Sequence, residues 1–327
     1  MTPKGAEGSR ALLEMLGVAS VPGRQPGLDF VVLGGSMAAV LGETGSAAVA
    51  LGEFAAGLRS PVVGRVLVGR MGGLMTATAS RDGRSKTVLI PPDPCVPPEM
   101  TPGGMISLAA SASGSKRGEA RERTAELLKW LGLAGHADTP SARLSGEHRR
   151  LAFLGAALAS APSFLVVVCP VHECLIEPLT DFATHGTGKG ALFVASRLGE
   201  IPPGTEMIAL CDDAGVRAVV RHSQLLETVR GGSEIKVAFY PVLPRKIMEQ
   251  IPGIRDLAHR DGYYVFNHAD TAYALVQLSN TARANARSIA HLSVAPPSPA
   301  ALLATFMPER DVPAPDLFGA AKTEAGS

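Results

Sequence analysis

The sequence has few of the features that mark secreted or nucleic-acid-binding proteins. Only four cysteines occur in 327 residues, which is too few for a disulfide framework and fits a reducing compartment. Lys and Arg number 31 against 30 Asp and Glu, for a formal charge of +1, so the chain lacks the basic excess that binds nucleic acid or an anionic bilayer. We therefore expect a cytoplasmic protein with no nucleic-acid partner.

Long uninterrupted apolar runs are also missing. Residues 153–171 are the most apolar stretch, but Ser160, Pro162 and Ser163 interrupt them, which favours a buried helix followed by a strand over a membrane span. The first residues mix acids with bases and hold no bounded apolar segment, so we expect no secretory signal. Because 46% of residues are hydrophobic and 19% charged, a sizeable core can form.

Glycine and proline divide the chain into short apolar runs that alternate with amphipathic stretches, which is typical of an α/β domain. We predict strands over residues 30–32, 36–41, 63–68, 87–90, 164–168, 191–195 and 207–210. We predict helices over residues 46–58, 119–131, 147–160 and 175–184. Residues 91–102 hold six prolines, which indicates a rigid irregular loop or a linker.

The composition of the chain changes after about residue 230. Short segments there predict a small α+β unit; they are residues 233–239, 245–251, 262–266, 271–278 and 289–294. Residues 309–327 are rich in Ala, Pro and charge, which is typical of a flexible tail. The sequence thus indicates a second, smaller domain and a loose end.

The first informative motif is a strand, a glycine loop and a helix around residues 37–57. Gly42 and Gly45 occupy the loop, and this order is the scaffold of a phosphate-binding loop. The pattern G-x-x-x-x-G-K-[ST] requires Gly, Lys and Ser or Thr where the chain has Ala47, Ala48 and Val49, so both the ammonium and the magnesium-binding hydroxyl are missing. Taken alone, an ordinary strand-to-helix turn is the better interpretation, although the backbone N–H groups leave weak anion binding open.

The second motif is a polar turn that opens an apolar helix, followed by a turn at Pro162 and a hydrophobic strand. This stretch resembles the core of ATP-binding cassette (ABC) transporter ATPases, where an L-S-G-G-Q signature loop precedes a Walker B strand that ends in Asp-Glu-Pro. The strand here is followed by Pro170, as in the family, but Val168 and Cys169 stand at the positions of the magnesium-organising Asp and the catalytic Glu. The signature positions, of which the last two depart from the family, are Leu144, Ser145, Gly146, Glu147 and His148.

The resemblance extends over about residues 12–308. Residues 88–101 are similar to the family's Q-loop, with Pro92 at the usual Gln or Glu position. Residues 188–197 match the strand before the switch histidine, whose place Ser196 takes. Other matching segments are residues 59–69, residues 126–133 and, as in the accessory domain of ATPases that serve ABC-2-type exporters, residues 251–254 and 294–306.

The resemblance implies a P-loop NTPase fold of the ABC ATPase type over residues 1–225, with an α-helical insertion at about 105–160, and a small α+β accessory domain over 230–308. It also implies that Ala48, Val168, Cys169 and Ser196 converge on one pocket. Losing one charge-stabilising donor typically costs a phosphoryl-transfer enzyme about 2.7–4 kcal/mol. We therefore expect a degenerate, non-hydrolysing structural or regulatory subunit of an ABC-2-type export complex, with no magnesium site and no required cofactor, although weak ATP binding stays open.

The implied partners are an active ABC ATPase subunit, in a hetero- or homodimer, and a polytopic membrane subunit that would hold the chain at the inner face of the membrane. The helix that begins after Ser145 and Gly146 presents N–H groups to a phosphate on the active partner. Glu147 repels such a phosphate unless His148 or Arg149 compensates. The proline-rich residues 91–102 are expected to shape the surface that receives the membrane subunit.

Three alternatives remain. Cys169 ends an apolar strand three residues before His172, which is a pattern for a nucleophilic thiol, although Pro170 opposes the helix expected directly after it. Cys169, His172 and Cys174 suggest metal ligands but lack a fourth partner, so buried thiols and a surface imidazole are the better interpretation. The third alternative keeps the fold without transport, as a scaffold in a motility or envelope assembly.

Overall fold

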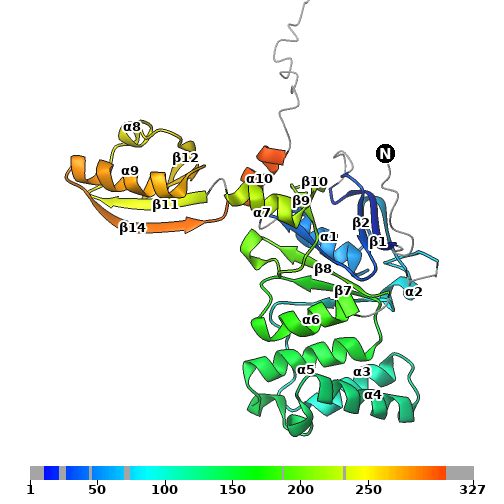
Figure 1. Cartoon of the computed structure of the whole chain (residues 1–327). Coiled ribbons are helices and arrows are strands. Elements are labelled where there is room, and N and C mark those ends of the chain that lie inside the picture. The colour runs from blue at the N-terminus through cyan, green and yellow to red at the C-terminus, as the bar shows by residue number, and fades with distance from the viewer. Residues whose placement is uncertain are drawn as a thin grey trace, which may run out of the picture.

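The computed structural model describes residues 11–21, 27–43, 46–69, 74–185, 188–230 and 233–306. A six-stranded sheet in the order β10-β9-β3-β8-β7-β6 forms its centre (Figure 1). Its strands are β3 (Met37–Gly42), β6 (Thr87–Ile90), β7 (Phe164–Val168), β8 (Gly190–Ala195), β9 (Met207–Cys211) and β10 (Val216–Arg221). All neighbours pair in parallel except β10 with β9, and β3 and β8 are buried at every residue, as expected for a sheet covered on both faces.

Two separate cores cover the two faces of this sheet. Successive residues of β3 alternate between them, with Ala39 and Leu41 in one core and Ala38 and Val40 in the other. The first core also contains side chains of α5 (Gly146–Ala159), α6 (Glu173–His185) and α7 (His222–Arg230), and the second those of α1 (Ala47–Ala55). The central strands and these helices confirm the α/β architecture predicted from the apolar runs.

A small antiparallel sheet packs on the far side of α1. It has the order β2-β1-β4-β5, and its strands are β1 (Ala11–Ala19), β2 (Phe30–Leu33), β4 (Val63–Val68) and β5 (Thr76–Ala77), followed by α2 (Arg81–Arg84). The strand β1 was not predicted, because its sequence ALLEMLGVA consists mainly of good helix formers. Pairing with both β2 and β4 overrides that local preference.

Three helices form the predicted helical insertion, at the bottom of Figure 1. They are α3 (Pro102–Ala112), α4 (Arg117–Trp130) and α5, with the short 3-10 turns η1 (Ala134–His136) and η2 (Ser141–Arg143) between the last two. Gly155 of α5 allows close packing, because a Cβ there would lie 2.8 Å from Cδ1 of Ile106. The helix α3 was not predicted, although Thr101 caps it and Pro102 occupies its first turn.

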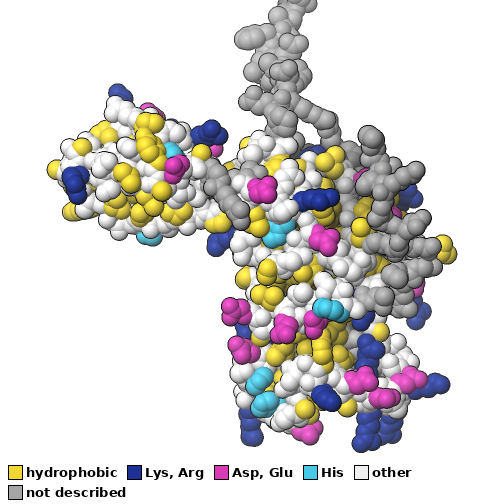
Figure 2. All heavy atoms as spheres, viewed as in Figure 1, with side chains coloured by type: hydrophobic (Ala, Val, Ile, Leu, Met, Phe, Trp, Pro, Cys, Tyr) yellow, Lys and Arg dark blue, Asp and Glu magenta, His cyan; other side chains and the backbone are white. Residues whose placement is uncertain are grey.

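The C-terminal unit is a four-stranded antiparallel sheet with helices on one face. Its order is β12-β13-β11-β14, and its elements are β11 (Ser233–Tyr240), α8 (Arg245–Met248), β12 (Arg255–Arg260), β13 (Tyr263–His268), α9 (Thr271–Ala284) and β14 (Ser288–Ala295). Ile235, Val237 and Phe239 of β11 point into a core of its own. Figure 2 shows apolar side chains scattered over the visible face of this unit, and the exposed ones include Tyr240, Leu292 and Val294.

The last helix differs from the predicted domain boundary at 308. The helix α10 (Pro299–Phe306) leaves the small sheet and packs on β9, β10 and β3, where Leu302 is 1% exposed and part of the core of the first domain. The small unit therefore ends with β14, and α10 belongs to the first domain. The predicted tail, residues 309–327, lies outside the described residues. Among the described helices, we find no apolar stretch of the length that a membrane span requires.

Candidate functional site

The predicted site residues follow the ends of adjacent parallel strands. Leu41 pairs with Ala195, and Val168 pairs with Val194, so the chain positions after β3, β7 and β8 meet at one edge of the sheet. Pro92 follows β6 at the same edge, because Ile90 pairs with Val167. Ligands of open α/β sheets bind at this carboxyl edge. The structure thus brings the Walker-like, Q-loop-like and switch-like positions to one side.

The start of α1 has its backbone N–H groups already bonded within the chain. Ser46 donates to the carbonyl of Glu43 at 2.8 Å, and Ala47 donates to the carbonyl of Asp212 at 3.0 Å. The side chain of Ser46 accepts the N–H of Ala48 at 3.3 Å. A phosphate-binding loop needs such groups free to point at the ligand. These three N–H groups are therefore not available to an anion in this conformation; Thr44 and Gly45 lie outside the described residues.

The side chains at the Walker-like positions are apolar. Ala47 and Ala48 are buried in the core beneath the small antiparallel sheet, at 3% and 2% exposure, whereas Val49 is 50% exposed. Gly42 is tightly enclosed, since a Cβ would lie 2.3 Å from Oγ of Ser46 and 3.2 Å from the carbonyl oxygen of Cys211. The loop keeps a tight strand-to-helix turn, and the three positions Ala47, Ala48 and Val49 carry neither an ammonium group nor a hydroxyl.

A residue that sequence reasoning missed, Glu200, contacts the ends of both β7 and β8. The thiol of Cys169 contacts its backbone carbonyl at 3.4 Å. Oε2 of Glu200 accepts hydrogen bonds from the N–H of Ser196 at 3.0 Å and from its Oγ at 3.2 Å. The sequence signal is a glutamate three residues after Arg197, which is the spacing of a capping box. Arg197 is the N-cap of the short turn η3 (Leu198–Glu200), and Glu200 is its third residue. Ser196 is thus committed to a structural contact.

The protonation state of Cys169 disfavours the nucleophile alternative. Burial, reinforced by the nearby charge of Glu200, raises the pKa of the Cys169 thiol to about 12, whereas reactive thiols have lowered pKa values. His172 is exposed on the turn before α6, and no hydrogen bond joins it to Cys169 in the described part of the chain. The described residues also contain no cluster of three His, Cys, Asp or Glu side chains able to hold a metal ion.

A cavity of about 800 Å³ opens beside this edge, between the first domain and the C-terminal unit. Glu43, Glu200 and Glu234 line it together with Ser196 and Arg197. Burial raises the pKa of Glu234, and the charge of Glu43 raises it further, so these two carboxylates repel each other across the cavity. Three carboxylates against one guanidinium make the cavity a poor environment for a triphosphate.

The signature-like loop lies at an exposed helix start. Ser145 caps α5 by accepting the N–H of His148 at 3.1 Å, and both Ser145 and Glu147 are exposed. The ring of His148 lies 4.4 Å from that of His136, centroid to centroid, and Arg149 donates to the carbonyl of Leu144 at 3.2 Å. Neither basic residue forms an ion pair with Glu147 among the described residues, so the charge of Glu147 is not neutralised there.

The chain is similar in sequence to ATP-binding proteins of transporters. It is 30% identical to the Fe(3+) ions import ATP-binding protein FbpC of Brucella suis over 148 residues. This aligned region covers 45% of this chain and 41% of that protein. It is 32% identical over 140 residues to the methionine import ATP-binding protein MetN 1 of Rhodococcus jostii, with 42% and 41% covered. The match thus spans about two fifths of the length of these relatives. No family model matches the chain.

Solved structures with the same fold cover about two thirds of the chain. The structure of cbiO1 from Clostridium perfringens, part of an ABC transporter complex, superimposes with a TM-score of 0.57 at 17% identity, over 66% of this chain and 91% of the other. An ATP-binding cassette in its ADP conformation gives a TM-score of 0.55 at 17% identity, over 67% and 94%. Such identities establish the fold and leave the activity open. The chain therefore contains a domain with the fold of the nucleotide-binding ATPase domains of ABC transporters.

Proposed function

We propose that this protein is a non-hydrolysing subunit of an ABC transporter complex, in which it acts as a structural or regulatory partner of an active ATPase subunit. The proposal depends on the loop from Gly42 to α1. This loop keeps the turn of a phosphate-binding loop, but apolar side chains replace the lysine and the hydroxyl. The N–H groups at the start of the helix form hydrogen bonds within the chain. Val168, Cys169 and Ser196 extend the loss to the Walker B and switch positions. We assign it no magnesium site and at most weak ATP binding.

The proline-rich loop supports a docking role toward the membrane subunit. The loop has no regular secondary structure, as predicted. It is hydrogen-bonded to η2, because the side chain of Ser141 donates to the carbonyl of Pro97 at 2.6 Å. The backbone N–H groups of Ser141 and Ala142 donate to the carbonyls of Met100 and Pro98 at 2.9 and 3.0 Å. Cys95, Pro97, Pro98 and Glu99 remain exposed. A surface that is rigid before binding loses little entropy when a partner docks.

The identity of the membrane subunit would decide between export and import. The likeness of the C-terminal unit to accessory domains of ABC-2-type ATPases favours export. The curated relatives are named for iron and methionine import, and they supply the competing prediction. Isolation of the tagged full chain from native membranes, followed by identification of its polytopic partner, separates export, import and the non-transport scaffold, which would be recovered without a polytopic partner.

Measurement of ATP turnover tests the inactivity of the chain. The purified full-length protein is expected to show no magnesium-dependent ATP hydrolysis and no saturable ATP binding in calorimetry at submillimolar concentrations. The Glu43→Gln variant removes one carboxylate from the cavity and is expected to remain inactive, because Ala48 and Val49 still stand where a lysine and a hydroxyl would hold phosphate and magnesium. Robust hydrolysis by the lone wild-type chain refutes the proposal.

A second experiment addresses the docking surface. Replacing Pro97 and Glu99 together by Gly and Arg is expected to lower recovery of the membrane subunit in a pull-down at least several-fold. The matched control is Glu126→Arg on α4, which is exposed and outside the loop. Unchanged recovery with the loop variant contradicts the docking role.

A further inference from the structure

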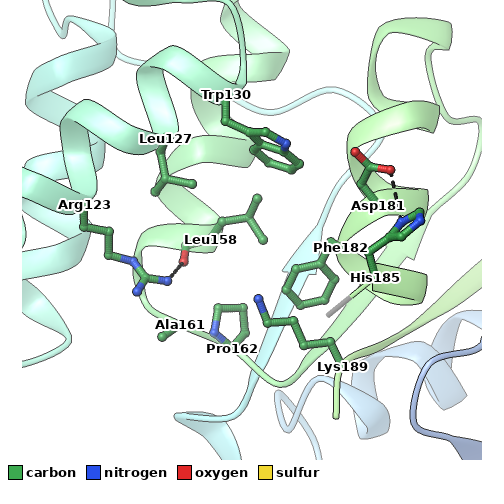
Figure 3. Close-up of a pocket in the computed structure, with 10 residues that line it drawn as sticks. All are labelled: Arg123, Leu127, Trp130, Leu158, Ala161, Pro162, Asp181, Phe182, His185 and Lys189. Atoms are coloured by element: carbon green, nitrogen blue, oxygen red, sulfur yellow. Dashed lines mark hydrogen bonds and ion pairs between the residues drawn. The ribbon is translucent and has the colours of Figure 1, made fainter. Parts of the chain in front are cut away.

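A second cavity, of about 330 Å³, lies at the opposite edge of the sheet from the candidate site. Ala161 and Pro162 line it from the turn before β7, and Lys189 lines it from the residue before β8, so it faces the amino ends of the parallel strands. The helix α4 forms its other wall (Figure 3). Its volume is at the lower end of the range of about 300–1,000 Å³ for small-molecule pockets.

Two cations face this cavity without a carboxylate partner. Neither Arg123 nor Lys189 forms an ion pair within the described part of the chain, and the acid in the wall, Asp181, lies 3.4 Å from His185 instead. Arg123 donates to the neutral carbonyl of Leu158 at 2.8 Å, and its Nε is buried with no acceptor. Burial lowers the pKa of Lys189, and the charge of Arg123 lowers it further. The two positive charges therefore repel each other, and an anion bound between them would reduce this repulsion.

The remaining walls are apolar and aromatic. Figure 3 shows Trp130 and Leu127 on α4 across the cavity from Phe182 on α6, with Pro162 beside the ammonium of Lys189. The Nζ of Lys189 lies 4.8 Å from the centroid of the Phe182 ring. Trp130 is 45% exposed, so part of a large apolar ring is left uncovered by the residues that the structure describes. An inorganic anion would leave these walls uncovered, whereas an apolar group would bury them.

We propose that this cavity binds a small organic carboxylate, with its carboxylate between Lys189 and Arg123 and its apolar body against Trp130, Leu127 and Phe182. Charge-assisted hydrogen bonds fix one end of such a ligand, and apolar burial supplies affinity at the other. This site is independent of the candidate nucleotide site, because it lies at the other edge of the sheet. Its presence or absence therefore does not depend on the proposed function.

Trp130 is the only tryptophan of the chain, so its fluorescence reports on this cavity directly. The full-length protein is titrated with octanoate and with 4-phenylbutyrate, and in parallel with octanamide and with inorganic phosphate. At least one carboxylate is expected to change the fluorescence saturably and to raise the melting temperature. Octanamide and phosphate are expected to bind at least about tenfold more weakly, since each lacks one half of the recognised chemistry.

The variant Lys189→Gln is expected to weaken carboxylate binding about tenfold or more, and Lys129→Gln, an exposed position on α4, to leave it unchanged. If Lys189→Gln does not fold, Leu127→Glu tests the same site, because its carboxylate competes for the two cations and should abolish binding. Absence of saturable binding by both carboxylates overturns the proposal. Equal affinity for octanamide, or for phosphate, also overturns it, as does full binding by Lys189→Gln.

Discussion

The backbone N–H of Ala47 donates a 3.0 Å hydrogen bond to the carbonyl oxygen of Asp212. The side chain of Asp212 stabilises the turn after β9 that carries this carbonyl. It accepts hydrogen bonds from the N–H groups of Ala214 and Gly215 at 2.8 and 3.1 Å, and from Nε of Arg217 at 2.7 Å. The chain itself thus supplies an acceptor at a helix start where a nucleotide-binding protein places phosphate.

The pair of Asp212 and Arg217 is expected to give a stability term that depends on pH. Burial alone would raise the pKa of Asp212, but hydrogen bonds from Arg217, Ala214 and Gly215 lower it overall. A lowered pKa adds stability above the ordinary value of 3.8, and that stability is lost as the pH falls through the lower folded-state value.

Arg217→Gln should therefore lower the free energy of unfolding by roughly 0.5–1 kcal/mol at pH 7, a small value because the pair is partly exposed. The deficit should shrink between pH 5 and pH 3 in urea denaturation. Arg221→Gln, at the exposed end of β10, is the control. An equal deficit at every pH would show that the effect of Arg217 is not electrostatic.

Substitution of Gly42 is expected to disturb the start of α1. An alanine methyl would lie 2.3 Å from Oγ of Ser46, so the capping side chain must move and the free energy of unfolding should fall by about 1–3 kcal/mol. Gly118→Ala is the matched control, because its Cβ meets nothing within 4 Å and a helical alanine is intrinsically favoured. Thermal melting compares the two, and a neutral Gly42→Ala variant would contradict the tight turn.

The thiol of Cys169 is expected to resist alkylation at neutral pH. Its pKa of about 12 leaves almost no thiolate, whereas Cys95 is an exposed thiol. Iodoacetamide at pH 7.5, followed by peptide mass spectrometry, should label Cys95 first. Because the folded pKa lies above the ordinary value of 9.0, stability should also fall as the pH rises beyond about 9, where only the unfolded thiol ionises. Labelling of Cys169 ahead of Cys95 would revive the nucleophile interpretation.

The packing of α10 is testable through Leu302. This side chain is 1% exposed in the first core, so Leu302→Ala should lower the free energy of unfolding by about 2–4 kcal/mol. Ala304→Ser, on an exposed position of the same helix, should have little effect. If Leu302→Ala is also neutral in calorimetric melting, α10 does not contribute to the core.

Local patterns predicted the parts of the fold in which periodicity and pairing agree. The buried strands β3, β7 and β8 are continuous apolar runs, and Ser145 marks the start of α5. The strand β1 and the final docking of α10 depend on partners distant in the sequence, which no local pattern reveals. At the site, the apolar residues Ala48 and Val49 are visible in the sequence. The bond from Ala47 to Asp212 and the contacts of Glu200 required the fold, because they join residues brought together only by the sheet.

The C-terminal unit enters the chain between α7 and α10, both of which pack on the first domain. It is therefore an insertion held at both ends, unlike a terminal appendage joined by one linker. A partner that binds the exposed edge strand β14 would load the connections to α7 and to α10 at the same time. Because α10 packs on β9 and β3, a displacement of the unit would act on these strands close to the turn that caps α1, and would couple a bound partner mechanically to the first domain.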